Sequence, residues 1–223
     1  LLRVLIQDVD LTDDQKIAFF DMRQDNIENR EDAPKRRRGK KAIIAYAKGD
    51  LSAKEWHSHI DEIASMRFEK RISKIESLHD IIETYSDEQK EQVIENLNVK
   101  NNKPKRAHPK KRRGQRLDRL AKALDLNDSQ QDLLNELKTH KESEQESRKD
   151  ARSDKKERLL RLIDGNASLR SIKSKMKSEH KERIEAQHDL ADIWIELIDS
   201  LNKEQRAMLS KKFNTRKGKP NRR

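Results

Sequence analysis

The chain has no cysteine and few glycine, proline or aromatic residues. Its 223 residues include 5 Gly and 4 Pro, and aromatic residues make up 4%. Without cysteine there are no disulfides, no thiolate metal ligands and no cysteine nucleophile. A β-rich fold with many tight turns needs more turn-forming residues than this. The composition therefore predicts an all-α fold.

Long apolar segments are also missing. No run approaches the ~20 apolar residues that span a bilayer, so no transmembrane segment is expected. Hydrophobic residues make up 32% and charged residues 42%, which is too little apolar content for a thick globular core. Long helices that share a narrow apolar seam suit such a chain. The chain begins at Leu1 and not at Met, so we expect its native start to lie outside the printed sequence, with no signal peptide inside it.

Basic residues exceed acidic ones, with 52 Lys and Arg against 41 Asp and Glu and a net charge of +11. An excess of this size predicts attraction to acidic partners, whether nucleic acid, anionic lipid or acidic protein segments. The sign of the charge does not choose among them.

Residues 11–15, Leu-Thr-Asp-Asp-Gln, have the form of a helix capping box. The Thr12 hydroxyl can accept from the backbone N–H of Gln15, and the Gln15 side chain can accept from the N–H of Thr12. A helix is therefore predicted to start here.

The same capping-box motif occurs four times, in two pairs with matched spacing. Gln15 to Gln89 is 74 residues and Gln130 to Gln205 is 75, which predicts a tandem duplication with two boxes in each copy. The residue before each cap is apolar or aromatic and is expected to be buried against another helix. The four copies are Leu11-Thr12-Gln15, Tyr85-Ser86-Gln89, Leu126-Asn127-Gln130 and Leu201-Asn202-Gln205.

The repeat predicts two helical units, at 1–97 and 115–214, joined by a basic linker at 98–114 and followed by a basic tail at 215–223. Each unit is expected to contain two short helices, one long helix and one closing helix. Gly49 and Gly165 are predicted to end the second short helices. Residues 138–158 are nearly devoid of apolar side chains, which fits either a solvated helix or partial disorder.

Two boxes that bracket a long amphipathic helix resemble the Spy/CpxP family of periplasmic proteins, which carry the LTxxQ signature twice per domain. The resemblance implies a hairpin-like helical unit that pairs with a second copy into an extended, curved dimer, here an intramolecular pseudo-dimer. It also implies a periplasmic location and an ATP-independent chaperone that binds unfolded or partly folded envelope proteins. The alternatives are a regulator that binds the periplasmic domain of an envelope-stress sensor kinase, and a metal-responsive sensor.

The basic run between the first two predicted helices is a candidate contact for clients or partners. The alternative is that these charges bind no partner and, as a solvated surface, keep the protein soluble. The residues of this cluster are Lys35, Arg36, Arg37, Arg38, Lys40 and Lys41.

The histidines do not predict a metal site. His57 and His59 lie two residues apart on a predicted helix and so do not face each other, and His180 and His188 lie two turns apart. Ligands that converge from different helices remain the alternative. No cofactor is expected.

The sequence also bears on two further function classes. An enzyme is not expected, because the sequence has no Gly-rich phosphate loop, nucleophile elbow or HExxH motif. Nucleic-acid binding is favoured by the pI of about 9.7. Against it, aromatic residues do not alternate with the basic ones and acidic residues occur in every predicted helix. No nucleic-acid partner is expected, and a basic nucleic-acid-binding helical protein is the second alternative function.

Overall fold

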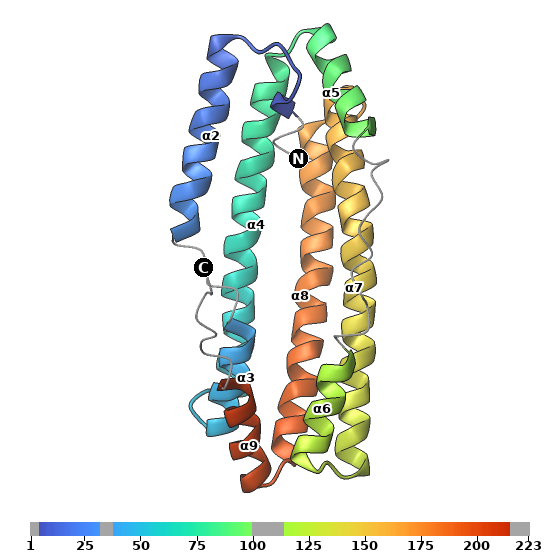
Figure 1. The fold of residues 1–223 in the computed structure, drawn as a ribbon. Coiled ribbons are helices and arrows are strands. Elements are labelled where there is room, and N and C mark those ends of the chain that lie inside the picture. The colour runs from blue at the N-terminus through green and yellow to red at the C-terminus, as the bar shows by residue number, and fades with distance from the viewer. Residues whose placement is uncertain (1–4, 32–37, 100–113, 215–223) are drawn as a thin grey trace, which may run out of the picture. The chain divides into compact units, whose positions relative to one another are not determined.

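A computed structural model describes residues 5–31, 38–99 and 114–214. All regular structure in these ranges is helical, which confirms the all-α prediction (Figure 1). None of the described helices combines the length and apolar content needed to cross a membrane. The helices are α2 (Asp13–Glu31), α3 (Arg38–Lys48), α4 (Ala53–Glu83), α5 (Asp87–Val99), α6 (Gly114–Leu124), α7 (Asp128–Ile163), α8 (Leu169–Ser200) and α9 (Lys203–Asn214).

Glycine marks two helix ends. Gly49 follows α3 with φ of 80°, and Gly165 lies just past α7 with φ of 68°. A positive φ costs little without a Cβ, so glycine suits a residue that turns the chain out of a helix. After α3, the N–H of Asp50 donates to the Ala45 carbonyl at 2.9 Å. Both stop positions had been predicted from the sequence.

Helix α7 corrects one prediction. Residues 128–163 form a single helix, whereas a separate short helix had been predicted for the segment before Gly165. This segment contains neither Gly nor Pro and is rich in Glu, Lys, Arg, Gln and Leu, all good helix formers. The first predicted unit differs in sequence here, because it has Pro34 between its first two predicted helices. Residues 138–158 are therefore helical, as one of the two alternatives for this stretch predicted.

Contacts between residues divide the described chain into two compact units. Unit 1 comprises α2, α4 from Ser65 onward, α5, α7 from Ser147 onward and α8 up to Lys181. Unit 2 comprises α3, the preceding part of α4, α6, the first part of α7, the rest of α8, and α9. Each of these compact units thus takes helices from both of the units predicted from the sequence, 1–97 and 115–214. The tandem repeat and the pseudo-dimer arrangement stay predictions.

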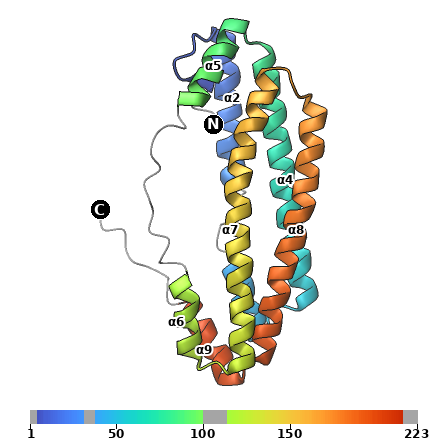
Figure 2. The same cartoon turned by 90° about the vertical axis from the view of Figure 1, so that its right-hand side faces the viewer.

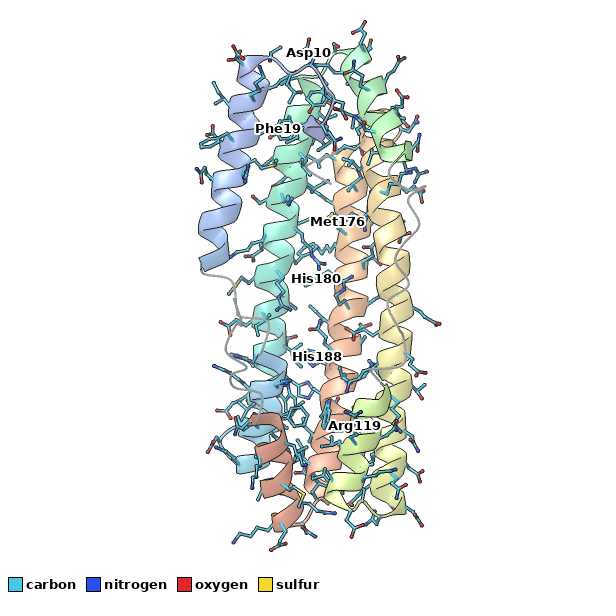
Figure 3. All side chains as sticks on the ribbon, viewed as in Figure 1. Asp10, Phe19, Arg119, Met176, His180 and His188 are labelled. Carbon is cyan, nitrogen blue, oxygen red and sulfur yellow. The ribbon has the colours of Figure 1, made fainter. Side chains whose placement is uncertain are left out.

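The core of unit 1 surrounds the start of α2 and the end of α4. Phe19, which Figure 3 labels on α2, and Met22 are buried. The Phe19 ring lies 6.4 Å from the ring of Tyr85. The remaining members come from α4, α5, α7 and α8 and the residues before α2. They include Leu5, Leu11, Leu78, Ile81, Ile82, Val93, Leu97, Leu159, Leu162, Ile163 and Ile172.

The core of unit 2 centres on the last turns of α8. Trp194, Leu197 and Ile198 are buried there, and the Phe213 ring of α9 meets the Trp194 ring edge-on at 6.0 Å. Helix α9 packs against α3 and α6, as Figures 1 and 2 show. Trp56 from α4 and Leu134 and Leu137 from α7 complete the cluster.

Candidate functional site

The four motif copies start α2, α5, α7 and α9. At the first, the Thr12 N–H donates to Gln15 Oε1 at 2.9 Å and the Gln15 N–H donates to the Thr12 hydroxyl at 3.3 Å. The copy at Ser86 has the corresponding distances of 3.0 and 3.3 Å. Asn127 and Asn202 accept through Oδ1 at 2.9 and 2.8 Å. These are the reciprocal hydrogen bonds of a capping box.

The two boxes of unit 1 are joined to each other through their glutamines. Gln15 Nε2 donates to Gln89 Oε1 at 3.1 Å, and Gln89 Nε2 donates to Gln15 Oε1 at 3.0 Å. Each amide also reaches the loop before the other helix: Gln15 donates to the Thr84 carbonyl at 2.8 Å, and Gln89 donates to the Asp10 carbonyl at 2.5 Å. Both glutamines are buried. We call this arrangement a glutamine clamp.

Unit 2 has a second glutamine clamp with the same connections. Gln130 and Gln205 exchange amide hydrogen bonds at 3.4 and 3.3 Å. Gln130 donates to the Ser200 carbonyl at 2.7 Å, and Gln205 donates to the Asp125 carbonyl at 3.2 Å. In all four cases the accepting carbonyl lies two residues before a cap. Each glutamine therefore serves two helix starts, its own and its partner's.

The apolar residue before each cap is buried, as predicted. Leu11, Tyr85, Leu126 and Leu201 all belong to the cores. Tyr85 also donates its hydroxyl to the Leu5 carbonyl at 3.0 Å. A buried side chain next to the cap anchors the loop that the clamp hydrogen-bonds.

Replacing Tyr85 with Phe is expected to reduce the loss of stability at alkaline pH. Burial raises the pKa of the Tyr85 hydroxyl above its ordinary value. The unfolded chain therefore releases this proton at lower pH than the folded chain, and stability present below about pH 10 is lost as the pH rises further. Urea unfolding between about pH 8 and 11 measures this. Equal pH slopes for wild type and Y85F would contradict it.

The predicted basic cluster is only partly within the described residues. Lys35, Arg36 and Arg37 lie outside them, and Arg38 begins α3. Lys40 places its ammonium 5.7 Å from the centre of the Phe213 ring, in unit 2, and Lys41 is exposed. Lys40 is thus engaged with an aromatic side chain of α9.

Helix α2 carries apolar side chains on both faces. Gln15, Phe19 and Met22 face inward, while Ile17 and Phe20 are 58% and 59% exposed. Because they lie three residues apart on the helix, Ile17 and Phe20 share one face and together form a small exposed apolar surface. Sequence periodicity could not separate the two faces, because α2 is apolar at Ile17, Phe19, Phe20 and Met22 alike.

The clamps were also missed at the sequence level. A capping box predicts that each glutamine bonds to the cap of its own helix. Only the matched spacings of 74 and 75 residues suggested a bond between the two glutamines of a pair. Equal spacing shows that two motifs recur together but does not show that their side chains touch.

Comparison with known proteins adds one match. Residues 112–213 match the model described as LTXXQ motif family protein. No curated protein and no solved structure matches the chain. The matched segment contains the boxes at Asn127 and Asn202, which form the clamp of unit 2. Residues 112–213 of this chain are therefore similar to the LTXXQ motif family of the Spy/CpxP type.

Proposed function

We propose that this protein is a periplasmic, ATP-independent chaperone-like protein that holds unfolded or partly folded envelope proteins. The family match supports the compartment and the general role. The observation that carries the proposal is the pair Ile17 and Phe20, which α2 presents to solvent. Exposed apolar groups beside charge suit a surface that binds unfolded chains without a defined sequence.

The glutamine clamp supports this use of α2. Gln15 is bonded both to the cap of its own helix and to the loop before α5. With Gln15, Phe19 and Met22 held inward, the helix cannot turn to bury Ile17 and Phe20. The capping motif would thus contribute to function by determining which face of α2 is exposed for client binding.

The positive charge of the chain supports an electrostatic first step in client binding. A net charge of +11 attracts acidic segments before apolar contact forms. Lys16 and Arg23 are exposed on the same side of α2 as Phe20, although Lys16 is also paired with Asp13 at 2.9 Å. The basic cluster at residues 35–41 stays a proposed partner contact. Client capture should therefore slow as salt is raised.

The test is suppression of aggregation of a chemically denatured client, without ATP, by the full chain and by the double variant Ile17→Ser, Phe20→Ser. Both side chains are exposed, so the variant should keep its fold. Loss of apolar contact worth about 1.4 kcal/mol weakens client binding by roughly tenfold. The matched control is Asp14→Ser, Gln24→Ser, which changes two exposed polar residues of the same helix.

Wild type and the control should suppress aggregation equally, and the serine variant should require much more protein for the same effect. Absence of suppression by wild type would reject the chaperone proposal. If wild type instead bound one sensor-kinase periplasmic domain tightly and nothing else, the regulator would be the correct interpretation. Equal suppression by all three proteins would show that α2 is not the client surface.

A further inference from the structure

Unit 2 has an open hollow between the end of α3 and the start of α9, two helices that pack against each other (Figure 1). Its volume is about 780 Å³, which lies within the range of ligand-binding pockets. Part of the lining is apolar: Ala47 and Leu201 are buried core residues, and Tyr46 and Ala207 complete this part. The hollow therefore offers apolar surface to a ligand that enters it.

Three cations, Lys48, Lys203 and Arg206, also line the hollow, and none of its described lining residues is acidic. Lys48 and Lys203 are exposed. Arg206 is fixed in place, because its Nε–H donates to the Leu201 carbonyl at 3.0 Å and its Nη2 donates to the Asp199 carbonyl at 2.9 Å. These two bonds use only part of its N–H donors, and its side chain is 38% exposed. A guanidinium held in this way is ready to bind a carboxylate. We call this hollow the basic hollow.

The carboxylate of Asp199 lies close to these cations and offsets part of their charge. It accepts a hydrogen bond from the Tyr46 hydroxyl at 2.9 Å and lies 3.9 Å from Arg206 Nη2. Three cations against one carboxylate leave the hollow positive. Lys203 adds an independent indication, since it is the first residue of α9, where the helix dipole favours acidic side chains. A cation that goes against a local preference is expected at a functional position.

Unit 1 has a hollow in the corresponding position, between the end of α7 and the start of α5, with a volume of about 450 Å³. Most of its lining residues lie 116 residues from a lining residue of the basic hollow, as Gly165 does from Gly49. Its charge is largely inverted, although Lys90 is basic. Asp164 corresponds to Lys48, Asp87 to Lys203 and Glu91 to Ala207. A similar backbone setting thus accommodates either charge, so the fold does not require the basic lining.

We propose that the basic hollow binds an acidic peptide segment in which carboxylate side chains lie next to an apolar one. The carboxylates pair with Lys48, Lys203 and the fixed guanidinium of Arg206, and the apolar side chain covers Ala47 and Leu201. A small inorganic anion would use only the cations. A purely apolar segment would remove the cations from water without pairing them, which is costly. An acidic, partly apolar segment is the occupant that satisfies both kinds of lining.

The site is separate from the surface proposed to hold clients. Helix α2 belongs to unit 1 and the basic hollow to unit 2, so the double variant Ile17→Ser, Phe20→Ser should bind the acidic peptide as wild type does. A protein that fails the aggregation assay could still bind this peptide, and the converse also holds. Because the lysines are exposed, binding should weaken as salt is raised.

The test measures the fluorescence anisotropy of a labelled Glu-Leu-Glu-Leu-Glu peptide, blocked at both ends, as the full chain is added. A peptide with Gln in place of Glu has a similar shape without the charge. Wild type should bind the Glu peptide, and the Gln peptide should bind about tenfold more weakly. Equal binding of the two peptides would overturn the proposal, because the cations would then contribute nothing. The absence of binding would overturn it as well.

The variant Lys48→Gln, Lys203→Gln removes two of the cations and leaves Arg206 in place. Both lysines are exposed, so its circular dichroism should match that of wild type, while its affinity for the Glu peptide falls roughly fivefold to tenfold. The matched control is Lys54→Gln, Lys211→Gln, which removes the same charge from exposed positions of unit 2 outside the hollow. The control should bind as wild type does. Equal losses in the two variants would contradict a site in the hollow, because net charge alone would then attract the peptide.

Two further measurements do not depend on the affinity of a variant. Backbone amide NMR shifts on addition of the Glu peptide should change most at Lys48, Gly49 and residues 203–210, and changes centred elsewhere would overturn the proposal. Sedimentation velocity examines the other occupant, a second copy of this chain. Self-association that Lys48→Gln, Lys203→Gln abolishes, without binding of the peptide, would assign the hollow to a second copy and overturn the peptide proposal.

Discussion

Replacing Gln89 with alanine is expected to lower the free energy of unfolding by about 2–4 kcal/mol. The change removes the acceptor for the Ser86 N–H and the donor to the Asp10 carbonyl. It also leaves the buried Gln15 amide without the partner with which it exchanges two hydrogen bonds. Loss of a cap and exposure of unpaired buried groups therefore act together. Urea unfolding followed by circular dichroism measures the change.

The control for this prediction is Gln24→Ala. Gln24 is exposed on α2, and a surface substitution to a good helix former changes stability by no more than about 0.5 kcal/mol. A loss for Gln89→Ala as small as that for Gln24→Ala would show that the clamp contributes little to the fold.

Replacing Leu197 with alanine is expected to cost about 2–5 kcal/mol. Leu197 has no exposed surface and lies in the core of unit 2. Truncation removes apolar contacts and leaves a cavity that surrounding side chains fill only in part. The same unfolding measurement reports the loss, with helicity at zero denaturant as a check on the native state.

Leu190→Ala is the matched control, because Leu190 lies two turns earlier on the same helix and is only partly buried against the same core. Its loss should be clearly smaller than that of Leu197→Ala. Equal losses at the two sites would mean that the core does not centre on the end of α8.

Local rules were enough to predict most of the fold. The cap residues, the apolar residues before them and the glycines at positions 49 and 165 each act within one or two turns, so their effects can be predicted without knowledge of the tertiary structure. The continuity of helix α7 was harder to predict. Its middle is rich in charged residues of high helix propensity and has no apolar stripe that would indicate a buried face. Periodicity is a signal of burial, and a solvated helix does not produce it.

The features that concern function were the least predictable. The glutamine clamps depend on which helix starts come together. The exposure of Ile17 and Phe20 likewise depends on which side of α2 its anchors hold inward. A sequence lists these side chains but does not state their partners. The basic cluster was conspicuous in the sequence, and of its residues Lys40 contacts the Phe213 ring and Lys41 is exposed.

The central claim is that each pair of LTxxQ-type boxes acts as one device through its two glutamines. A double-mutant cycle on Gln15 and Gln89, with each residue changed to alanine alone and together, measures this directly. We expect a coupling free energy of about 1–2 kcal/mol, with a similar value for Gln130 and Gln205 in unit 2. Additive losses at both pairs, with coupling near zero, would show that the boxes are independent helix caps.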